Sequence, residues 1–278
     1  MALAEASDTG AAERASGSSF YNAMRVLPRA QREAMFEIYS FCRQVDDIAD
    51  SSGPRDQRRD ALARWRADVD ALYAGRLVPR TRGLSAPVRE FGLKREDFHA
   101  IIDGMEMDVV ADIRAPDEAT FDRYCDRVAS AVGRLSVRVF GMDECNGIAL
   151  AHHLGRALQL TNILRDLDED ASFGRLYLPV EALCAAGIGA TDPATVLASP
   201  ALGMVCADLV GRARAHFLQA DQIMARSARR TVRAPRIMAE AYRLILDGLV
   251  ARGWAHPRRP VHLPRSRLLW IIMRHAFI

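Results

Sequence analysis

Three aspartates, Asp46, Asp47 and Asp50, lie near the end of a segment that is otherwise apolar. If this segment is helical, Asp46 and Asp50 lie only about 40° apart on the helix surface. Arg43 lies one turn earlier, on nearly the same face. Carboxylates at this spacing repel one another unless a cation neutralises them. The pattern fits either a solvated helix end or one half of a divalent-metal site.

A second polar stripe occurs between Leu158 and Asp170. Four of its residues share one helix face, each within about 40° of Asp166: Gln159, Asn162, Asp166 and Asp170. The neighbours are leucines and an isoleucine, so the stripe should be at least half-buried, where oxygen atoms without partners are costly. Mg²⁺ takes oxygen ligands and keeps phosphate oxygens in its shell. Two such stripes facing each other would hold a diphosphate through bridging Mg²⁺. The two motifs together are a far more specific sequence signal for such a site than either motif alone.

The alternating aspartates Asp166, Asp168 and Asp170 also allow a calcium-loop interpretation. Ala171 stands where an EF-hand loop needs its glycine, and no loop is evident, so this interpretation fails. We also find no Ser-His-Asp arrangement, no nucleotide-binding glycine loop and no zinc-ligand spacing.

Other polar residues could complete a site for phosphate and for a cationic intermediate. Hydroxyl and guanidinium groups can bind phosphate oxygens; the candidates are Ser18, Ser19, Arg43, Arg165 and Arg175. Tyrosines can offer a π face and a hydroxyl to a carbocation; the candidates are Tyr21, Tyr39, Tyr124, Tyr177 and Tyr242. Ordinary packing or surface pairing explains each of them equally well when taken alone. The adjacent His152 and His153 are expected to be structural, because neighbouring helical positions do not face one another.

Helical signals dominate the whole chain. Pro28 and Pro54 stand where helices begin, and Gly75 stands where the second one ends. Pro179 begins a short helix that Gly187 closes. Further helical patterns cover 95–110, 118–140, 146–170, 200–229, 233–252 and 263–275, with a capped turn at Asp192-Pro193. No alternating strand or linker is evident after residue 17. We predict one all-α domain over 18–278, preceded by a disordered tail over 1–17.

The composition restricts the class of protein. The charged fraction is 26% and the net charge is +3, which is too balanced for a nucleic-acid binder. The five cysteines form no C-x-x-C pair and lie mostly in apolar helical patterns, as in a reduced cytoplasmic protein. The longest apolar run near the end, 268–273, is too short to span a bilayer.

The order and spacing of these motifs resemble the squalene/phytoene synthase family over about residues 18–255. The resemblance is carried by 18–50, with Met24-Arg25-Val26-Leu27-Pro28, and by 159–179, with Asn162-Ile163-Leu164-Arg165-Asp166 and Gly174-Arg175-Leu176-Tyr177-Leu178-Pro179. Within the family, the first block is most similar to the bacterial presqualene diphosphate synthases of the hopanoid pathway. Phytoene synthases are the nearest competitor.

The resemblance implies an isoprenoid-synthase helical bundle with a central cavity that joins two farnesyl diphosphates head to head. It implies Mg²⁺, with Mn²⁺ as a substitute, as the cofactor, and no NADPH. The implied metal ligands are Asp46, Asp50, Asp166 and Asp170, assisted by Gln159 and Asn162. The implied diphosphate contacts are Arg43, Arg165 and Arg175. Ser19 and Phe20 would line the cavity entrance, Tyr21 and Tyr242 would contact substrate, and Tyr124 and Tyr177 would lie near the reacting carbons.

One departure bears on the reaction. Asp47 gives the first block the extra aspartate of chain-elongating prenyltransferases, but the second block lacks the paired aspartates of those enzymes, which favours head-to-head condensation. A phytoene synthase, a complete squalene synthase and a catalytically inactive assembly factor of the same fold remain alternatives. The last should have lost metal ligands, and both acidic stripes are complete here. The prenyl chain length, the proton acceptor and the oligomeric state are left open.

The segment 265–275 places Trp270 and a short apolar block between arginines. Such a block suits peripheral contact with an anionic inner membrane, which would spare a long-chain product a passage through water. A terminal helix packed on the bundle explains Leu268, Ile271 and Ile272 equally well. The short block favours packing.

Overall fold

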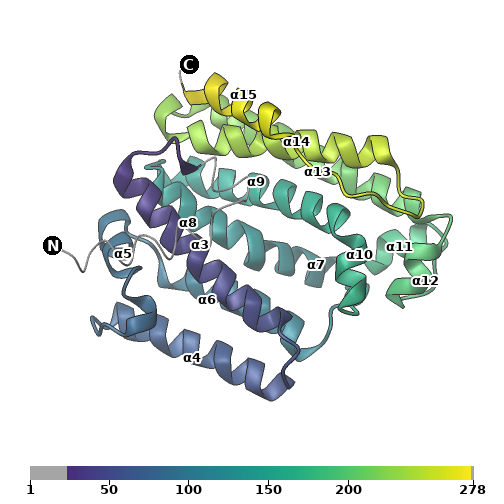
Figure 1. Ribbon diagram of the computed structural model, residues 1–278, viewed down its shortest axis with the longest axis horizontal. Coiled ribbons are helices and arrows are strands. Elements are labelled where there is room, and N and C mark those ends of the chain that lie inside the picture. The colour runs from purple at the N-terminus through teal and green to yellow at the C-terminus, as the bar shows by residue number, and fades with distance from the viewer. Residues whose placement is uncertain (1–23, 277–278) are drawn as a thin grey trace.

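The computed structural model describes residues 24–276, and the predicted tail over 1–17 lies outside them. The described residues form helices and no β-strand; one isolated backbone bridge joins Arg114 to Leu176. The elements, labelled as in Figure 1, are α3 (Arg29–Asp50), α4 (Arg55–Tyr73), η1 (Pro79–Thr81), α5 (Ser85–Phe91), α6 (Arg95–Val110), α7 (Glu118–Cys125), η2 (Asp126–Ser130), α8 (Ala131–Val139), α9 (Glu144–Arg165), α10 (Leu167–Ser172), α11 (Val180–Ala185), α12 (Pro193–Ala198), α13 (Leu202–Arg226), η3 (Arg229–Thr231), α14 (Arg233–Arg252) and α15 (Arg265–Ala276). The all-α prediction is confirmed.

Most helix boundaries fall where the sequence predicts them. Pro28 and Pro54 directly precede α3 and α4, because a proline ring fixes the φ angle that a helix start requires. Gly75 follows α4 with φ of 76°, a left-handed conformation that favours glycine. Asp192 caps α12, since its Oδ2 accepts a hydrogen bond from the Thr195 backbone nitrogen at 3.0 Å.

Two predicted helices differ from the structure, and one short helix was not predicted. The helix expected over 118–140 contains the π-helical turn η2 between α7 and α8. The helix expected over 146–170 pauses at Asp166, where φ is −100° and ψ is 15°, and resumes as α10. The short helix α5 was not predicted. A π turn inserts one residue without changing the apolar pattern on either side, so residue periodicity does not reveal it.

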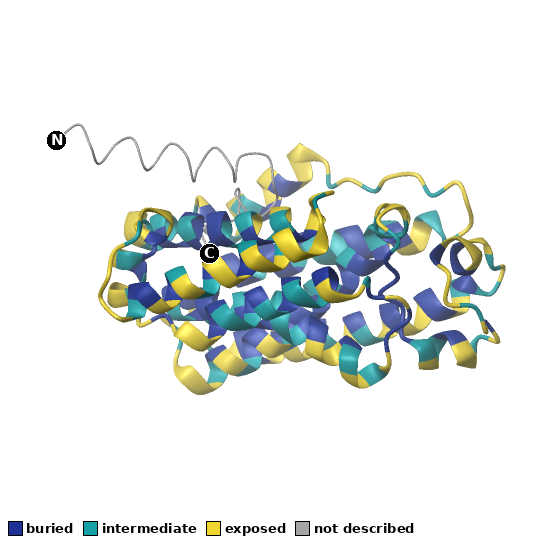
Figure 2. Cartoon of the chain, turned by 90° about the horizontal axis from the view of Figure 1, so that it is seen from below, coloured by how far each residue is buried: buried dark blue, intermediate teal, exposed yellow. Residues whose placement is uncertain are grey.

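Helix α9 lies at the centre of the molecule. The helices α4, α6, α8, α9 and α13 pack against one another in that order, and α14 also contacts α9 (Figure 1). Buried residues lie on the inner faces of these helices and exposed ones on the outside (Figure 2). They form two apolar clusters, and Val128, Leu158 and Tyr242 pack against both. The boundary between the two clusters, which we call the seam, therefore lies beside α9.

Two glycines allow close helix contact at this seam. A Cβ atom on Gly133 would lie 3.0 Å from the Ala151 Cα, and one on Gly155 would lie 3.0 Å from the Ser130 Cα. The backbones of η2, α8 and α9 can therefore approach more closely than larger residues would permit.

All five cysteines lie within the described residues and are free there. Cys125 and Cys206 are buried and Cys42 is half-buried. Cys145 and Cys184 are exposed, so the apolar pattern around them did not indicate core positions.

Candidate active site

The sequence candidates converge on one cavity of about 420 Å³. Its walls come from α3, α6, α7, η2, α8, α9 and α10 and from the loop after α10. The candidates that line it are Arg43, Asp46, Asp50, Tyr124, Gln159, Asn162, Arg165, Asp166, Asp170, Arg175 and Tyr177. Tyr39 and Tyr242 line an adjoining cavity. Ser18, Ser19, Phe20 and Tyr21 lie outside the described residues.

The end of α3 contributes two carboxylates to the cavity. Arg43 binds Asp46 and Asp47, with Nη1–Oδ2 and Nη2–Oδ1 distances of 2.8 and 2.9 Å. Asp47 is 63% exposed and does not line the cavity, whereas Asp46 and Asp50 do. Burial raises the pKa of Asp46 to about 6, and the carboxylate of Asp50 adds to the rise. The ionised carboxylate of Asp46, buried beside that of Asp50, therefore destabilises the folded protein when no cation neutralises it.

The end of α9 and the start of α10 supply the opposite wall. Arg165 binds both carboxylate oxygens of Asp166 at 2.7 Å. Burial raises the pKa of Asp170 to about 8, and Asp166 raises it further. Asp168, between them, binds Arg258 at 2.6 Å and does not line the cavity. The aspartates thus face different directions, as a helix requires and an EF-hand loop does not.

Asn162 has a buried Oδ1 atom with no hydrogen-bond partner among the described residues. Its Nδ2 lies 3.5 Å from the Gln159 Oε1, at the limit of a hydrogen bond. A buried acceptor without a partner is costly, and carboxylates with raised pKa values surround the same cavity. This donor set, made of carboxylate and amide oxygens, fits Mg²⁺.

Arg175 is the buried cation of the site. Its Nη1 binds the Asp50 Oδ1 at 2.6 Å, and its Nη2 donates to the Ala49 carbonyl oxygen at 2.9 Å. Its positive charge opposes the rise in the pKa of Asp46, Asp108 and Asp170. Arg175 therefore joins the end of α3 to the loop after α10 and offsets part of the negative charge of the cavity.

Asp108, on α6, is a site residue that the sequence interpretation missed. It is only 2% exposed, and burial raises its pKa to about 6. The Tyr177 hydroxyl donates to its Oδ1 at 2.8 Å, and the Tyr124 hydroxyl lies 3.4 Å from its Oδ2. The two tyrosine rings are stacked, with centroids 4.7 Å apart and an angle of 16° between planes. Asp108 thus fixes both rings at the cavity wall.

The sequence did contain a signal for Asp108. It follows Ile101 and Met105 at the spacing of one helix face, so a carboxylate stands where the pattern calls for an apolar residue. The loop before α7 positions its partner, because the Leu176 N–H donates to the Ile113 carbonyl oxygen at 2.7 Å. Tyr177 is the next residue.

An apolar cavity of about 270 Å³ adjoins the polar one. The two share five wall residues: Cys42, Val128, Val132, Gln159 and Asn162. The remainder of the apolar wall comes mainly from α8, α9 and α14 and includes Gly133, Gly155 and Tyr242. A ligand with a charged head and a hydrocarbon tail matches this pair of cavities.

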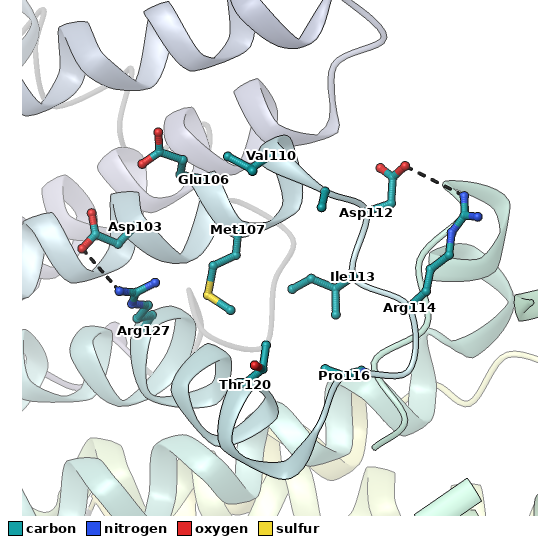
Figure 3. A pocket seen from close by; sticks show the side chains of 11 residues that line it. Asp103, Glu106, Met107, Val110, Asp112, Ile113, Arg114, Pro116, Thr120 and Arg127 are labelled. Atoms are coloured by element: carbon teal, nitrogen blue, oxygen red, sulfur yellow. Dashed lines mark ion pairs between the residues drawn. The ribbon is translucent and has the colours of Figure 1, made fainter. Parts of the chain in front are cut away.

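A larger groove of about 600 Å³ lies elsewhere, between α6, the loop after it, α7 and η2 (Figure 3). Its charged side chains already have partners: Asp103 lies 3.8 Å from Arg127, and Asp112 lies 3.9 Å from Arg114. None of the sequence candidates lines it. We therefore place the candidate active site in the smaller cavity.

Comparisons with known proteins show the family of the chain. The family model for squalene/phytoene synthase matches residues 13–267. The chain is 64% identical to a presqualene diphosphate synthase of Rhodopseudomonas palustris over 94% of both chains. It is 33% identical to a phytoene synthase of Thermus thermophilus, over 90% of this chain and 85% of the relative. A solved dehydrosqualene synthase in complex with ligand shares the fold, with a TM-score of 0.83 at 22% identity over 98% of this chain and 95% of that one. The chain belongs to the squalene/phytoene synthase family.

Proposed function

We propose that the protein condenses two farnesyl diphosphates head to head into presqualene diphosphate, with release of diphosphate. The observation that carries this proposal is the pair of adjoining cavities, one lined by carboxylates and arginines and the other apolar. The name of the relative at 64% identity supports the choice of product.

The metal ligands in this proposal are the oxygen atoms that face the polar cavity. They belong to Asp46, Asp50, Asn162, Asp166 and Asp170. Bound Mg²⁺ would neutralise the leaving diphosphate and so favour ionisation of its allylic C–O bond. The unpartnered Asn162 Oδ1 and the raised pKa values of Asp46 and Asp170 support this assignment.

The arginines hold the diphosphates. Arg43 and Arg165 are bound to carboxylates at the rim of the cavity. When a cation neutralises those carboxylates, both guanidinium groups can turn to phosphate oxygens, for which the planar fork is suited. Gln159 supplies a further polar contact on the same wall.

The reaction needs a dry surface beside the charged one. When the C1–O bond of the first substrate breaks, C1 becomes cationic and the double bond of the second substrate attacks it. Loss of a proton then closes the cyclopropane, and the products are presqualene diphosphate, diphosphate and the proton. The apolar cavity excludes water from the cation, and the stacked rings of Tyr124 and Tyr177 offer it a π face. The departed diphosphate or a tyrosine hydroxyl accepts the proton.

The first prediction concerns the product. With farnesyl diphosphate and Mg²⁺, presqualene diphosphate should accumulate, and added NADPH should not convert it to squalene. Mass spectrometry of the extracted products with and without NADPH tests this. Abundant squalene would identify a complete squalene synthase, and a strong preference for geranylgeranyl diphosphate would identify a phytoene synthase.

Helix α15 presents two different faces. Leu268 and Ile271 are buried against the bundle and Ile272 packs there partly buried, which confirms the packing expected for them. Leu269, Trp270 and Met273 are 58%, 52% and 54% exposed. The helix lies along α14 at the edge of the molecule (Figure 1). Among residues 24–276, no helix combines the length and apolarity needed to cross a bilayer.

The exposed face of α15 is surrounded by positive charge. The guanidinium groups of Arg267 and Arg274 lie 5.8 and 5.4 Å from the Trp270 ring centroid. A small basic pocket beside the helix is lined by Arg229, Arg233, Arg236, Arg274 and His275. We propose that this face rests on an anionic membrane surface, with Trp270 at the interface.

The second prediction tests this contact. The double variant Leu269→Glu, Trp270→Glu should bind vesicles of phosphatidylcholine and phosphatidylglycerol at least about tenfold more weakly, because apolar contact is lost and acidic charge is added. Co-sedimentation at low and high salt measures the effect. Leu218→Glu, at an equally exposed leucine of α13, is the matched control. Equal binding by the double variant and the wild type would remove α15 from the contact.

A further inference from the structure

Three histidines meet on the side of α9 that faces α13. His152 and His153 come from α9 and His216 from α13, and one ring nitrogen of each lies within 4.8 Å of the others. The Nδ1 atoms of His153 and His216 are 3.0 Å apart. The sequence interpretation, in which His152 and His153 do not face one another, is wrong, because their ring centroids are only 4.8 Å apart.

This cluster is separate from the site described above. None of the three histidines lines the polar or the apolar cavity. His152 and His153 stand about two turns before Gln159 on α9. Helix α13 packs along α9 and places His216 against the pair, so the cluster depends on tertiary packing and not on local spacing.

The three imidazole rings are in the neutral form that binds a metal ion. Burial lowers the pKa of all three histidines, that of His216 to about 4, so their rings are neutral at pH 7. A neutral imidazole offers a nitrogen lone pair to a metal ion. The two Nδ1 atoms share a hydrogen bond at 3.0 Å. A tetrahedral ion with 2.0–2.1 Å metal–nitrogen bonds needs them about 3.3 Å apart, so it can replace the shared proton, which moves to the other ring nitrogen, after a small outward shift.

Nearby arginines do not exclude a cation, because each has acidic partners. Arg156 lies 2.8 Å from Asp122 and Arg212 lies 2.8 Å from Glu118. Arg156 also donates to the His152 Nδ1 at 2.9 Å. The exposed His152 ring can turn away from this contact and free its nitrogen.

We propose that His152, His153 and His216 form a site for a divalent transition-metal ion, with Zn²⁺ as the representative ligand. Imidazole nitrogens suit Zn²⁺, Ni²⁺ and Cu²⁺, whereas Mg²⁺ takes oxygen, so the site is chemically distinct from the carboxylate cavity. Three protein ligands leave a fourth position open on the exposed side. The ion links α9 to α13.

Co²⁺ absorbance and Zn²⁺ titration test the proposal. The full-length protein is stripped of metal by chelation and kept in excess Mg²⁺ to occupy the carboxylates. One equivalent of Co²⁺ should then give visible absorption bands that Zn²⁺ removes, and Zn²⁺ should raise the melting temperature. No Co²⁺ bands and no Zn²⁺-dependent rise in melting temperature at a hundredfold excess of metal over protein would overturn the proposal.

Variants assign the ligands. His216→Gln should weaken Zn²⁺ binding by about 100-fold or more, and His152→Gln, at an exposed position, by about tenfold. His99→Gln, which changes a histidine on α6 that binds Asp70 instead, is the matched control. Asp166→Asn should leave the Co²⁺ spectrum unchanged. Unaltered binding in both His216→Gln and His152→Gln would show that the metal binds elsewhere.

Discussion

Replacing Asp170 by Asn should remove nearly all turnover and at the same time stabilise the metal-free protein. Turnover should fall by about 10³-fold or more, because the variant weakens the charge neutralisation that drives ionisation. The free energy of unfolding should rise because burial of the ionised Asp170 carboxylate destabilises the folded state, as its raised pKa of about 8 indicates. Diphosphate release from farnesyl diphosphate and thermal unfolding without metal measure the two effects.

The pH dependence of stability follows from the direction of the shift. The pKa of Asp170 is raised from 3.8 to about 8, so the folded state binds the proton more tightly than the unfolded state. The metal-free wild type should therefore lose stability as pH rises from 4 to 8, relative to Asp170→Asn. Each kcal/mol that Asp170→Asn adds to the free energy of unfolding should raise the melting temperature by about 2–4 °C. Mg²⁺ should raise the melting temperature of the wild type more than that of the variant.

Asp168→Asn is a matched control two residues away. Asp168 does not line the cavity, and Arg258 holds the pKa of its carboxylate below the usual value. This variant should keep turnover within about tenfold of the wild type. It should be less stable than the wild type, whereas Asp170→Asn should be more stable. If Asp170→Asn also kept turnover within tenfold, the two-stripe metal site would be incorrect.

Replacing Arg175 by Gln should impair both folding stability and turnover. The change removes the buried cation that binds Asp50 and offsets the charge of Asp108 and Asp170. Breaking a fully buried ion pair from one side typically costs about 3–5 kcal/mol, and the cost should be smaller here because the Asp50 side chain is 39% exposed. Turnover should fall by about 10²–10³-fold, since a preorganised charge is lost at the diphosphate site.

Urea unfolding and diphosphate release measure these effects. Arg214→Gln is the control, because Arg214 is 56% exposed on α13, binds Asp247 at 3.1 Å and does not line the cavity. It should behave like the wild type. Unchanged stability and turnover in Arg175→Gln would mean that the carboxylates do not depend on this cation.

Helical periodicity predicted much of the site correctly. A straight helix fixes which side chains share a face, so the stripes that end at Asp50 and at Asp170 could be identified from spacing alone. Their convergence on one cavity was inferred from two complementary stripes, and the cavity lining agrees with it. The roles of these residues in binding and catalysis stay predictions.

Features that arise from packing could not be predicted in the same way. Asp108 stands at an apolar position of the α6 pattern, and its role follows from two tyrosines that other elements bring to it. The π turn η2 has partners on a distant helix, since Arg156 of α9 binds the Ser130 hydroxyl at 2.8 Å. The histidine cluster likewise needs α13 beside α9.

The ratio of diphosphate released to farnesyl diphosphate consumed tests the central claim most directly. Head-to-head condensation that ends at presqualene diphosphate retains one of the two diphosphate groups. Quantitative phosphorus NMR of a complete reaction with Mg²⁺ should therefore give one diphosphate released for every two substrates consumed, whether or not NADPH is present. A ratio of one to one would contradict the account, because it would mean that both diphosphate groups leave, as in hydrolysis or in a reaction that continues past presqualene diphosphate.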